Sequence, residues 1–448
     1  MVPISVVVTV FNGQEALAEC LDTILGQTLP DFELVCVDDG STDSSPQILA
    51  EYAERDSRVS IITQPNMGLS HARNTGFDAT RGDYVLFLDA DDFYEPTYFE
   101  RARAQAEADD ADIVIVKFRY VRDGGALVVE TPGSLRTDLL PEKVPFGPLD
   151  VRGSLFRLTT PAAWNKLFKR KFLLKEGLRF DTSLTRAEDL AFTFGALMLA
   201  QRISVVNETM VNYRTGNEGS VQSTIHRDPL AICRALEVVR GVMIRNGLFD
   251  SLEQDLVNVC VAQCLFSLGS LRTVDAAQEL FESLKSHYLM EFGATNRDAS
   301  YFYSRSDYDR LRSLLSGTFG EYWFQESRRL SAELLSTSAK LGAAYSRLDV
   351  ARGAAKSHRI RTVERAEGSE LLDPSREQTI RMLMTRAQSL SFEVRDVSYE
   401  ILERRAKLEH VLASQEAATG SRLYRALSWV FPPAQARNQQ DSRSETEK

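Results

Sequence analysis

Polar side chains that can bind a cation or move a proton follow short apolar runs in the first hundred residues. The run that ends at Leu88 leads into Asp89-Ala90-Asp91-Asp92, and earlier runs lead into Thr9-Val10-Phe11-Asn12-Gly13 and Val37-Asp38-Asp39-Gly40. A fourth run leads into residues 66–74, which include Arg73. Two crowded carboxylates repel each other unless a cation offsets their charge, and oxygen ligands suit Mg²⁺ or Mn²⁺. The spacing therefore predicts a divalent-cation site at Asp89 and Asp91.

Each cluster taken alone also fits a turn followed by a helix N-cap, where Asp, Asn, Ser and Gly are common. An Asp-x-Asp pattern arises about once by chance in a chain of this length and ordinary composition. Asp110-Ala111-Asp112 is a second copy, and we interpret it as a solvated turn between a helix and a strand. The turn interpretation accounts poorly for four polar clusters that all follow apolar runs.

The apolar runs are typical of strands in a parallel sheet that is covered on both faces. The expected strands are residues 4–10, 33–38, 58–63, 84–88 and 112–120. Amphipathic helical patterns between them indicate right-handed crossovers and an open α/β sheet. Ligands of such sheets bind at the carboxyl ends of the strands, and the polar clusters lie there.

Several segments, in this order and spacing, resemble a known enzyme family. They are Val8–Asn12, Ile24–Thr28, Asp31–Asp43, Asn66–Gly76, Leu88–Asp92, Trp164–Phe168 and Ala187–Asp189. Together they resemble family 2 glycosyltransferases of the bacterial cell-surface polysaccharide type, which have the nucleotide-sugar-binding GT-A fold. The resemblance covers about the first 220 residues and leaves the C-terminal half unexplained.

The resemblance implies a donor pocket at the strand ends. Phe11 would stack on the nucleobase with Thr9 beside it, and Asp39 would accept a hydrogen bond from the imide N–H of the base, which favours uridine. Arg73 would lie near the base or the phosphates. General chemistry agrees, because an aromatic face suits a planar base and a buried acceptor discriminates by leaving wrong partners unpaired.

The resemblance also implies catalytic roles. Asp89 would face the ribose and the metal, Asp91 would bind the metal, and Asp189 would be the general base. The acceptor region would include Trp164, Asn165, Lys166 and Glu188. A sugar hydroxyl is a poor nucleophile, so we expect a carboxylate that acts as a general base and takes its proton. Taken alone, Glu188-Asp189 also fits a helix N-terminus, and Trp164 also fits a core position.

One departure from the family pattern concerns the metal. Many relatives have a His shortly after a Tyr-Arg pair as a further ligand, whereas Tyr213-Arg214 is followed by Thr215-Gly216-Asn217-Glu218-Gly219-Ser220. The missing metal ligand would have to come from Asn217, Glu218, the later His226 or water.

From Pro229 onward the sequence predicts helices. We expect a GT-A domain over residues 1–228, a helical domain over 229–315 and long helices over 316–418. Beyond Pro374 a seam with a spacing of three and four is apolar at nine of ten positions. The ten are Ile380, Leu383, Ala387, Leu390, Val394, Val397, Ile401, Arg404, Leu408 and Val411. A weaker seam lies over 330–351, so the two segments either form an antiparallel hairpin or pair between chains as a coiled coil.

Residues 419–448 combine an amphipathic segment with a polar tail that we expect to be disordered. The segment Ser421–Pro433 carries arginines and aromatic residues, which suit a membrane interface, and it equally suits a helix that caps the coiled coil. No run reaches the roughly 18 apolar residues of a membrane span, and the N-terminus lacks the features of a signal peptide. The five cysteines fit buried thiols in a reducing compartment. We therefore expect a cytoplasmic protein, with peripheral contact to the inner face of the cell membrane and homo-oligomerisation through the C-terminal helices as further hypotheses.

Charge limits the class of partner. The chain has 53 Lys and Arg against 63 Asp and Glu, a net charge of −10, and a pI near 5.3. An acidic chain of this kind lacks the electrostatic footprint of a general nucleic-acid binder.

The sequence therefore predicts an inverting glycosyltransferase of the hexosyltransferase class. It would move a sugar from a nucleotide diphosphate, with UDP favoured, to a hydroxyl of a glycan or cell-surface polymer, with Mn²⁺ or Mg²⁺ as cofactor. Two alternatives stay open at this point: a sugar-nucleotide nucleotidyltransferase, and a catalytically silent scaffold of a polysaccharide assembly complex. The first usually has a Gly-rich loop with a basic residue after its first strand, and Phe11-Asn12-Gly13 is not such a loop.

Overall fold

The fold is described from a computed structural model of the 448-residue chain. The structure describes residues 2–122, 127–131, 134–151, 153–215, 226–271 and 273–366, and five single residues beyond them. Those five are Val397, Ile401, Arg404, Arg405 and Glu409. Most of the second seam, residues 216–225 and the predicted amphipathic segment therefore lie outside the described residues.

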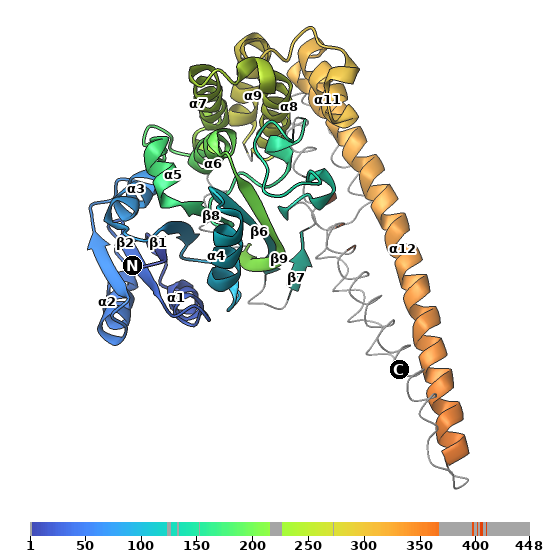
Figure 1. The fold of residues 1–448 in the computed structure, drawn as a ribbon. Helices are drawn as coiled ribbons and strands as arrows, with labels where there is room; N and C mark the ends of the chain where they lie inside the picture. Colours follow the sequence, from blue (N-terminus) through green and yellow to red (C-terminus); the bar gives the residue numbers. More distant parts are fainter. Residues whose placement is uncertain are drawn as a thin grey trace. The chain divides into compact units, whose positions relative to one another are not determined.

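The described strands of the first 215 residues form one mixed, nine-stranded sheet (Figure 1). The strands are β1 (Ile4–Val10), β2 (Phe32–Asp38), β3 (Val59–Thr63), β4 (Tyr84–Asp89), β5 (Phe93–Tyr94), β6 (Ile113–Arg122), β7 (Leu127–Glu130), β8 (Lys166–Lys169) and β9 (Ile203–Arg214). Their order is β3-β2-β1-β4-β8-β6-β9-β5, and β7 pairs with β6. Strands β1 to β4 are mutually parallel, β6 is parallel to β9, and β8 runs antiparallel between β4 and β6.

Helices cover both faces of the sheet, which explains why β1 and β2 are buried along their whole length. The helices of this part are α1 (Leu17–Leu25), α2 (Ser45–Arg55), α3 (Leu69–Ala79), α4 (Tyr98–Asp109), α5 (Arg170–Lys175) and α6 (Glu188–Leu199). On one face of the sheet, the alternate valines of β1 pack with side chains of α1, α2 and α4 in the main hydrophobic core. On the other face α3 packs on β1 and β2, and Phe192 of α6 packs edge-to-face on Phe87 of β4.

The α/β class and the five predicted strands are confirmed, with ends that differ by at most two residues. Four strands were not predicted from the sequence: β5, β7, β8 and β9. β9 has exposed polar residues at Asn207 and Glu208, where its register with β6 shifts between Val206 and Thr209, so its alternation is interrupted. β8 is only four residues long, which is too short for a periodicity signal.

The helical region after residue 228 begins as expected. Its helices are α7 (Ala231–Arg245), α8 (Phe249–Leu268), α9 (Val274–Ser283), a π-helical turn (Leu284–Tyr288), α10 (Leu289–Glu291), α11 (Arg305–Ser316) and α12 (Phe319–Ala366). Three short 3₁₀ helices complete the described elements, over Thr137–Leu139, Leu155–Arg157 and Ala299–Tyr301. The last of these lies between α10 and α11.

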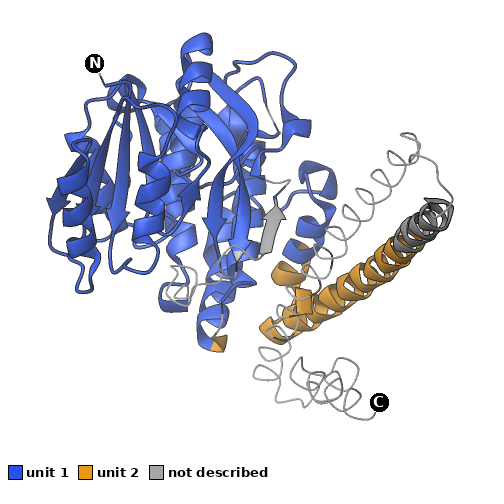
Figure 2. Ribbon diagram, turned by 90° about the horizontal axis from the view of Figure 1, so that it is seen from below, with its two compact units in different colours: residues 1–271, 275–311 blue, residues 272–274, 312–448 orange. Residues whose placement is uncertain are grey.

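The chain divides into two compact units (Figure 2). The first comprises residues 1–271 and 275–311, so the helices α7 to α10 belong to the same unit as the sheet. The second comprises residues 272–274 and 312–448. The predicted domain boundaries at 228, 315 and 418 stay predictions.

The second unit is built around α12, which has 48 residues and is therefore about 72 Å long. Leu330, Leu334, Thr337, Ala344 and Leu348 of the predicted weaker seam are buried along it. Arg404, the polar position of the predicted second seam, donates from Nη1 to Glu333 Oε2 at 2.6 Å. Arg404 of the second segment thus pairs with α12 of the same chain, as the hairpin hypothesis expects, whereas a coiled coil between chains stays a prediction.

None of the described helices has an apolar stretch long enough to cross a bilayer.

Candidate active site

The strand ends of β1, β2 and β4 bring the first predicted residues together. Thr9 lies opposite Val37 of β2 and opposite Asp89 of β4 in the sheet register. Asp39 directly follows β2, and its N–H donates to Val10 O at 2.8 Å. The carboxyl ends of parallel strands meet at one edge of a sheet, so Thr9, Asp39 and Asp89 share that edge.

Three carboxylates crowd the end of β4. Ligand oxygens of Asp89, Asp91 and Asp92 all lie within 4.8 Å of one another. Burial, followed by the negative charge of Asp89, raises the pKa of Asp91 to about 6. Burial also raises the pKa of Asp92, whose Oδ1 accepts from Arg214 N at 2.8 Å while its buried Oδ2 has no hydrogen-bond partner. Such a set of oxygens, one of them buried without a partner, fits a hard cation such as Mn²⁺ or Mg²⁺.

Arg73 connects this cluster to α6. The Arg73 side chain is only 2% exposed, and its Nη2 donates to Asp89 Oδ1 at 2.9 Å. Its Nη1 donates to Asp189 Oδ1 at 2.7 Å and approaches Glu188 Oε1 at 3.3 Å. The guanidinium also lies over the ring of Phe180, 5.0 Å from the centroid. One cation therefore holds the carboxylates of a strand end and of a helix start in fixed positions, and its predicted contact with the donor stays a prediction.

Asp189 and Glu188 occupy the first turn of α6, after Ala187 in the left-handed region at φ 57°. A non-glycine residue seldom adopts this conformation, and such strain concentrates at functional sites. Burial raises the pKa of Asp189, Arg73 opposes the rise, and the charges of Glu188 and Asp89 add to it. A carboxylate with a raised pKa that is held by an arginine is suited to accept a proton near neutral pH.

The predicted base-binding residues differ in exposure. The side chain of Phe11 is 51% exposed at the end of β1, and Met67 is similarly exposed. Asp39 is buried: its Oδ1 accepts from Gln64 Nε2 at 2.7 Å and from Met67 N at 3.0 Å, and its Oδ2 accepts from Gly68 N at 2.9 Å. Gln64 and the 67–68 backbone thus orient Asp39, a role that the sequence analysis did not foresee.

The predicted acceptor residues are deep in the fold. Trp164 stacks on Tyr213 with ring centroids 5.0 Å apart, and it is mostly buried. Asn165 and Lys166 have no exposed surface. Lys166 Nζ donates to Thr160 O, Ala162 O and Asn165 Oδ1 within 2.9 Å, and burial lowers its pKa to about 7. These contacts position the segment before β8, and contact of its side chains with an acceptor stays a prediction.

Comparisons with known sequences place this chain in a family. The sequence model of Glycosyl transferase family 2 matches residues 5–174. The putative glycosyltransferase EpsH of Bacillus subtilis is 31% identical over 290 residues, which cover 63% of this chain and 81% of EpsH. The chain belongs to glycosyl transferase family 2. The prediction of the family and of the enzyme class is thereby confirmed.

Two further relatives each match about half of this chain. The glycosyltransferase EpsJ of B. subtilis, described as uncharacterized, is 34% identical over 48% of this chain and 62% of EpsJ. The poly(ribitol-phosphate) beta-glucosyltransferase of Bacillus spizizenii is 31% identical over 57% of this chain and 39% of that protein. The chain thus spans less than two thirds of the length of these two relatives.

Arg214 is a residue of this glycosyltransferase that the sequence analysis noted without giving it a role. Its Nε donates to Asp91 O at 2.9 Å, and its Nη2 pairs with Glu19 Oε2 at 2.6 Å. It therefore fixes the backbone of the carboxylate cluster. Asn217 and Glu218, two candidates for the missing His, lie outside the described residues, and His226 has no described contact with the cluster.

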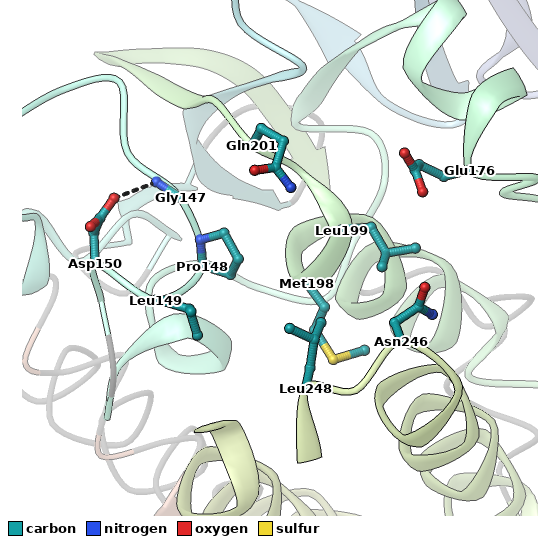
Figure 3. Close-up of a pocket in the computed structure, with 10 residues that line it drawn as sticks. All are labelled: Gly147, Pro148, Leu149, Asp150, Glu176, Met198, Leu199, Gln201, Asn246 and Leu248. Atoms are coloured by element: carbon teal, nitrogen blue, oxygen red, sulfur yellow. Dashed lines mark hydrogen bonds between the residues drawn. The ribbon is translucent and has the colours of Figure 1, made fainter. Parts of the chain in front are cut away.

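A cavity of about 440 Å³ is lined in part by Met198 and Leu199, at the C-terminal end of α6 (Figure 3). Asp189 lies at the N-terminal end of the same helix. Its lining comes from residues 147–150, the ends of α5 and α6, and the end of α7, including Glu176, Gln201 and Asn246. The predicted site residues do not line it. The two ends of the 12-residue α6 are about 16 Å apart, so this cavity is separate from the carboxylates of the glycosyltransferase site.

Proposed function

We propose that this family 2 glycosyltransferase transfers a sugar from a nucleotide-diphosphate donor, with UDP favoured, to a hydroxyl group of a glycan or cell-surface polymer, with inversion at the anomeric carbon. The observation that carries the proposal is the bridge from Asp89 through Arg73 to Asp189. It joins a carboxylate cluster that suits a diphosphate-bound cation to a carboxylate that suits proton abstraction.

The donor would lie along the carboxyl ends of β1, β2 and β4. The exposed ring of Phe11 offers a face on which a base can stack. Asp39 Oδ2 accepts from Gly68 N and has a second lone pair with which to accept from a uracil imide N–H. Cytosine has no imide N–H at this position, so the acceptor would favour uridine.

Asp89 and Asp91 would hold Mn²⁺ or Mg²⁺. When bound, such an ion supplies positive charge to the departing diphosphate. Asp92 accepts from Arg214 N, and Arg214 Nε donates to Asp91 O, so the loop that presents the two ligands is fixed from β9.

Asp189 would take the proton of the acceptor hydroxyl as the new glycosidic bond forms. Arg73 holds Asp189 Oδ1, so the other carboxylate oxygen would be the one that accepts the proton. A base on the face opposite the leaving diphosphate gives inversion in a single displacement.

The acceptor and location belong to the same proposal. The B. spizizenii relative is named for action on a poly(ribitol-phosphate), which supports a polymer acceptor here. We further propose a cytoplasmic enzyme that contacts the inner face of the cell membrane through residues 419–448. Self-association through the C-terminal helices completes the proposal.

The test is a panel of nucleotide sugars with Mn²⁺ present. We expect one UDP-sugar to bind and to be hydrolysed slowly, and EDTA to abolish the hydrolysis. With an acceptor found by product analysis, nuclear magnetic resonance should show an anomeric configuration opposite to that of the donor. A retained configuration would contradict the inverting mechanism, and a preference for GDP- or CMP-sugars would contradict the assignment of uridine.

A further inference from the structure

Three side chains that can bind a metal ion meet beside α7, and we call Glu237, His287 and Glu291 the His–Glu cluster. Glu237 lies on α7, His287 lies in the π-helical turn, and Glu291 ends α10. One ligand atom of each lies within 4.8 Å of the other two, and His287 Nε2 is 3.0 Å from Glu291 Oε2. All three belong to the first compact unit, so the cluster joins α7 to a segment that follows two further helices.

Glu237 is the carboxylate of the His–Glu cluster that lacks a direct partner. Among the described residues it has no hydrogen bond and no ion pair, whereas Glu291 lies 3.0 Å from His287 and 3.7 Å from Arg240 Nη1. Burial, followed by the negative charge of Glu291, raises the pKa of Glu237. The positive charges of His287, Arg234 and Arg240 reduce this rise without abolishing it. A divalent ion between the two carboxylates would offset their repulsion.

The His–Glu cluster is open to solvent on one side. The side chain of His287 is 58% exposed and that of Glu291 is 31% exposed. Residues four apart face the same side of a helix, so these two side chains lie together opposite Glu237 of α7. The π-helical turn that carries His287 is a rare element, and such turns are frequent at functional sites. The exposed imidazole therefore marks the side from which an ion can reach the carboxylates.

The ligand types of the His–Glu cluster differ from those of the cluster at the end of β4. Asp89, Asp91 and Asp92 offer oxygen atoms alone, which suit Mg²⁺ or Mn²⁺. The His–Glu cluster offers one imidazole nitrogen and two carboxylates, a mixed set that suits Zn²⁺. Three protein ligands leave the fourth position of a tetrahedral Zn²⁺ ion to water.

We propose that the His–Glu cluster binds a Zn²⁺ ion through Glu237, His287 and Glu291. The ion would tie α7 to the segment of α10 and so stabilise the helical part of the first compact unit. Its role would be structural, and the inference does not depend on the proposed function. The competing interpretation is an ordinary ion pair between a protonated His287 and Glu291, which needs no metal and gives Glu237 no role.

The test uses the full chain, freed of metal with EDTA and then dialysed into buffer that contains excess Mg²⁺. Zn²⁺ binding is measured by calorimetry, and the melting temperature is measured with and without Zn²⁺. The proteins are the wild type, His287→Gln, Glu237→Gln and the control Glu282→Gln, which removes an exposed carboxylate of α9. Any Zn²⁺ that binds at the aspartates of β4 would bind to all four proteins alike.

We expect the wild type and Glu282→Gln to bind one Zn²⁺ ion more than His287→Gln. Glu237→Gln should bind that ion at least about 10-fold more weakly, because it loses one charged ligand. Zn²⁺ should raise the melting temperature of the wild type and of Glu282→Gln more than that of either cluster variant, since an ion that binds only the folded chain stabilises it.

Equal Zn²⁺ stoichiometry and affinity in the wild type and in both cluster variants would overturn the inference and leave His287 and Glu291 as an ordinary ion pair. Wild-type affinity in Glu237→Gln would also overturn it, because Zn²⁺ would then bind to His287 without the carboxylate of α7. If His287→Gln fails to fold, Glu237→Gln alone decides between these outcomes.

Discussion

Arg73 is the residue on which the candidate site depends. Asp89, Glu188 and Asp189 would repel one another in a partly buried space, and the guanidinium between them offsets that repulsion. The sequence indicated each carboxylate separately, from its place after a strand or at a helix start. It did not indicate that Arg73 pairs with all three, because a contact between residues 73 and 189 depends on how α3 and α6 pack against the sheet.

Asp91→Asn tests the carboxylate cluster. The substitution removes one charged ligand without changing the side-chain volume, so Mn²⁺-dependent donor hydrolysis should fall on the order of 100-fold or more while the melting temperature stays close to that of the wild type. Asp110→Asn is the matched control, because Asp110 belongs to the second Asp-x-Asp copy and is exposed beside Lys169. Unchanged hydrolysis by Asp91→Asn at saturating Mn²⁺ would rule out this cation site.

Arg73 lies on α3, and the close packing of this helix on β1 positions it. A Cβ atom at Gly76, one turn after Arg73, would lie 2.3 Å from a methyl carbon of Val7. We expect Gly76→Ala to lower the free energy of unfolding by about 1–3 kcal/mol, since α3 must shift away from the sheet. Chemical denaturation measures the change.

Gly342→Ala should change the free energy of unfolding in the opposite direction, measured in the same way. Gly342 lies in α12, and a Cβ atom there would meet nothing within 4 Å. The substitution should stabilise the helix by roughly 0.5–1 kcal/mol, because alanine loses less backbone entropy than glycine. If both substitutions changed stability by the same amount, close packing at Gly76 would not be the cause.

Glu33, near the start of β2, makes the free energy of unfolding depend on pH. Burial disfavours its ionised form, but hydrogen bonds from Ser5 Oγ at 2.5 Å and Arg81 N at 2.6 Å outweigh burial and lower its pKa. A lowered pKa stabilises the fold above the unfolded value of about 4.3, and this contribution is lost as the pH falls through the folded value. Glu33→Gln should therefore unfold more easily than the wild type at pH 7, with a difference that shrinks below about pH 4. A difference that is constant from pH 7 to pH 3 would contradict this assignment.

The elements show what local sequence can and cannot predict. Strands β1, β2, β4 and β6 were predictable because each is a buried run bounded by turn residues. Trp164, Asn165 and Lys166 were assigned to an acceptor region by resemblance, yet their contacts are with Tyr213, Val116 and the 160–162 backbone. Val116 and Tyr213 are distant from these residues in sequence, and Tyr213 lies on the unpredicted strand β9, so no periodicity reveals these two contacts.

At the scale of the whole molecule, the candidate site and the long helix belong to different compact units. All predicted site residues belong to the first compact unit, and α12 belongs to the second. Truncation after Ser375 removes Val397, Ile401 and Arg404, which are half-buried. We expect the truncated chain to expose the seam of α12 and to form larger particles in light scattering, while donor hydrolysis per folded molecule is retained. Loss of hydrolysis in a truncated protein that stays folded and monomeric would place part of the donor pocket in the C-terminal region.

The central claim is that Asp189, held by Arg73, is the base of a single displacement on a nucleotide sugar. The most direct test compares Asp189→Asn with the wild type and with Glu188→Gln, measuring donor affinity and sugar transfer on the same samples. Asp189→Asn should bind the UDP-sugar as the wild type does and lose transfer by about 100-fold or more, because the acceptor hydroxyl no longer has a proton acceptor. Transfer by Asp189→Asn at the wild-type rate, or its loss only in Glu188→Gln, would contradict the claim.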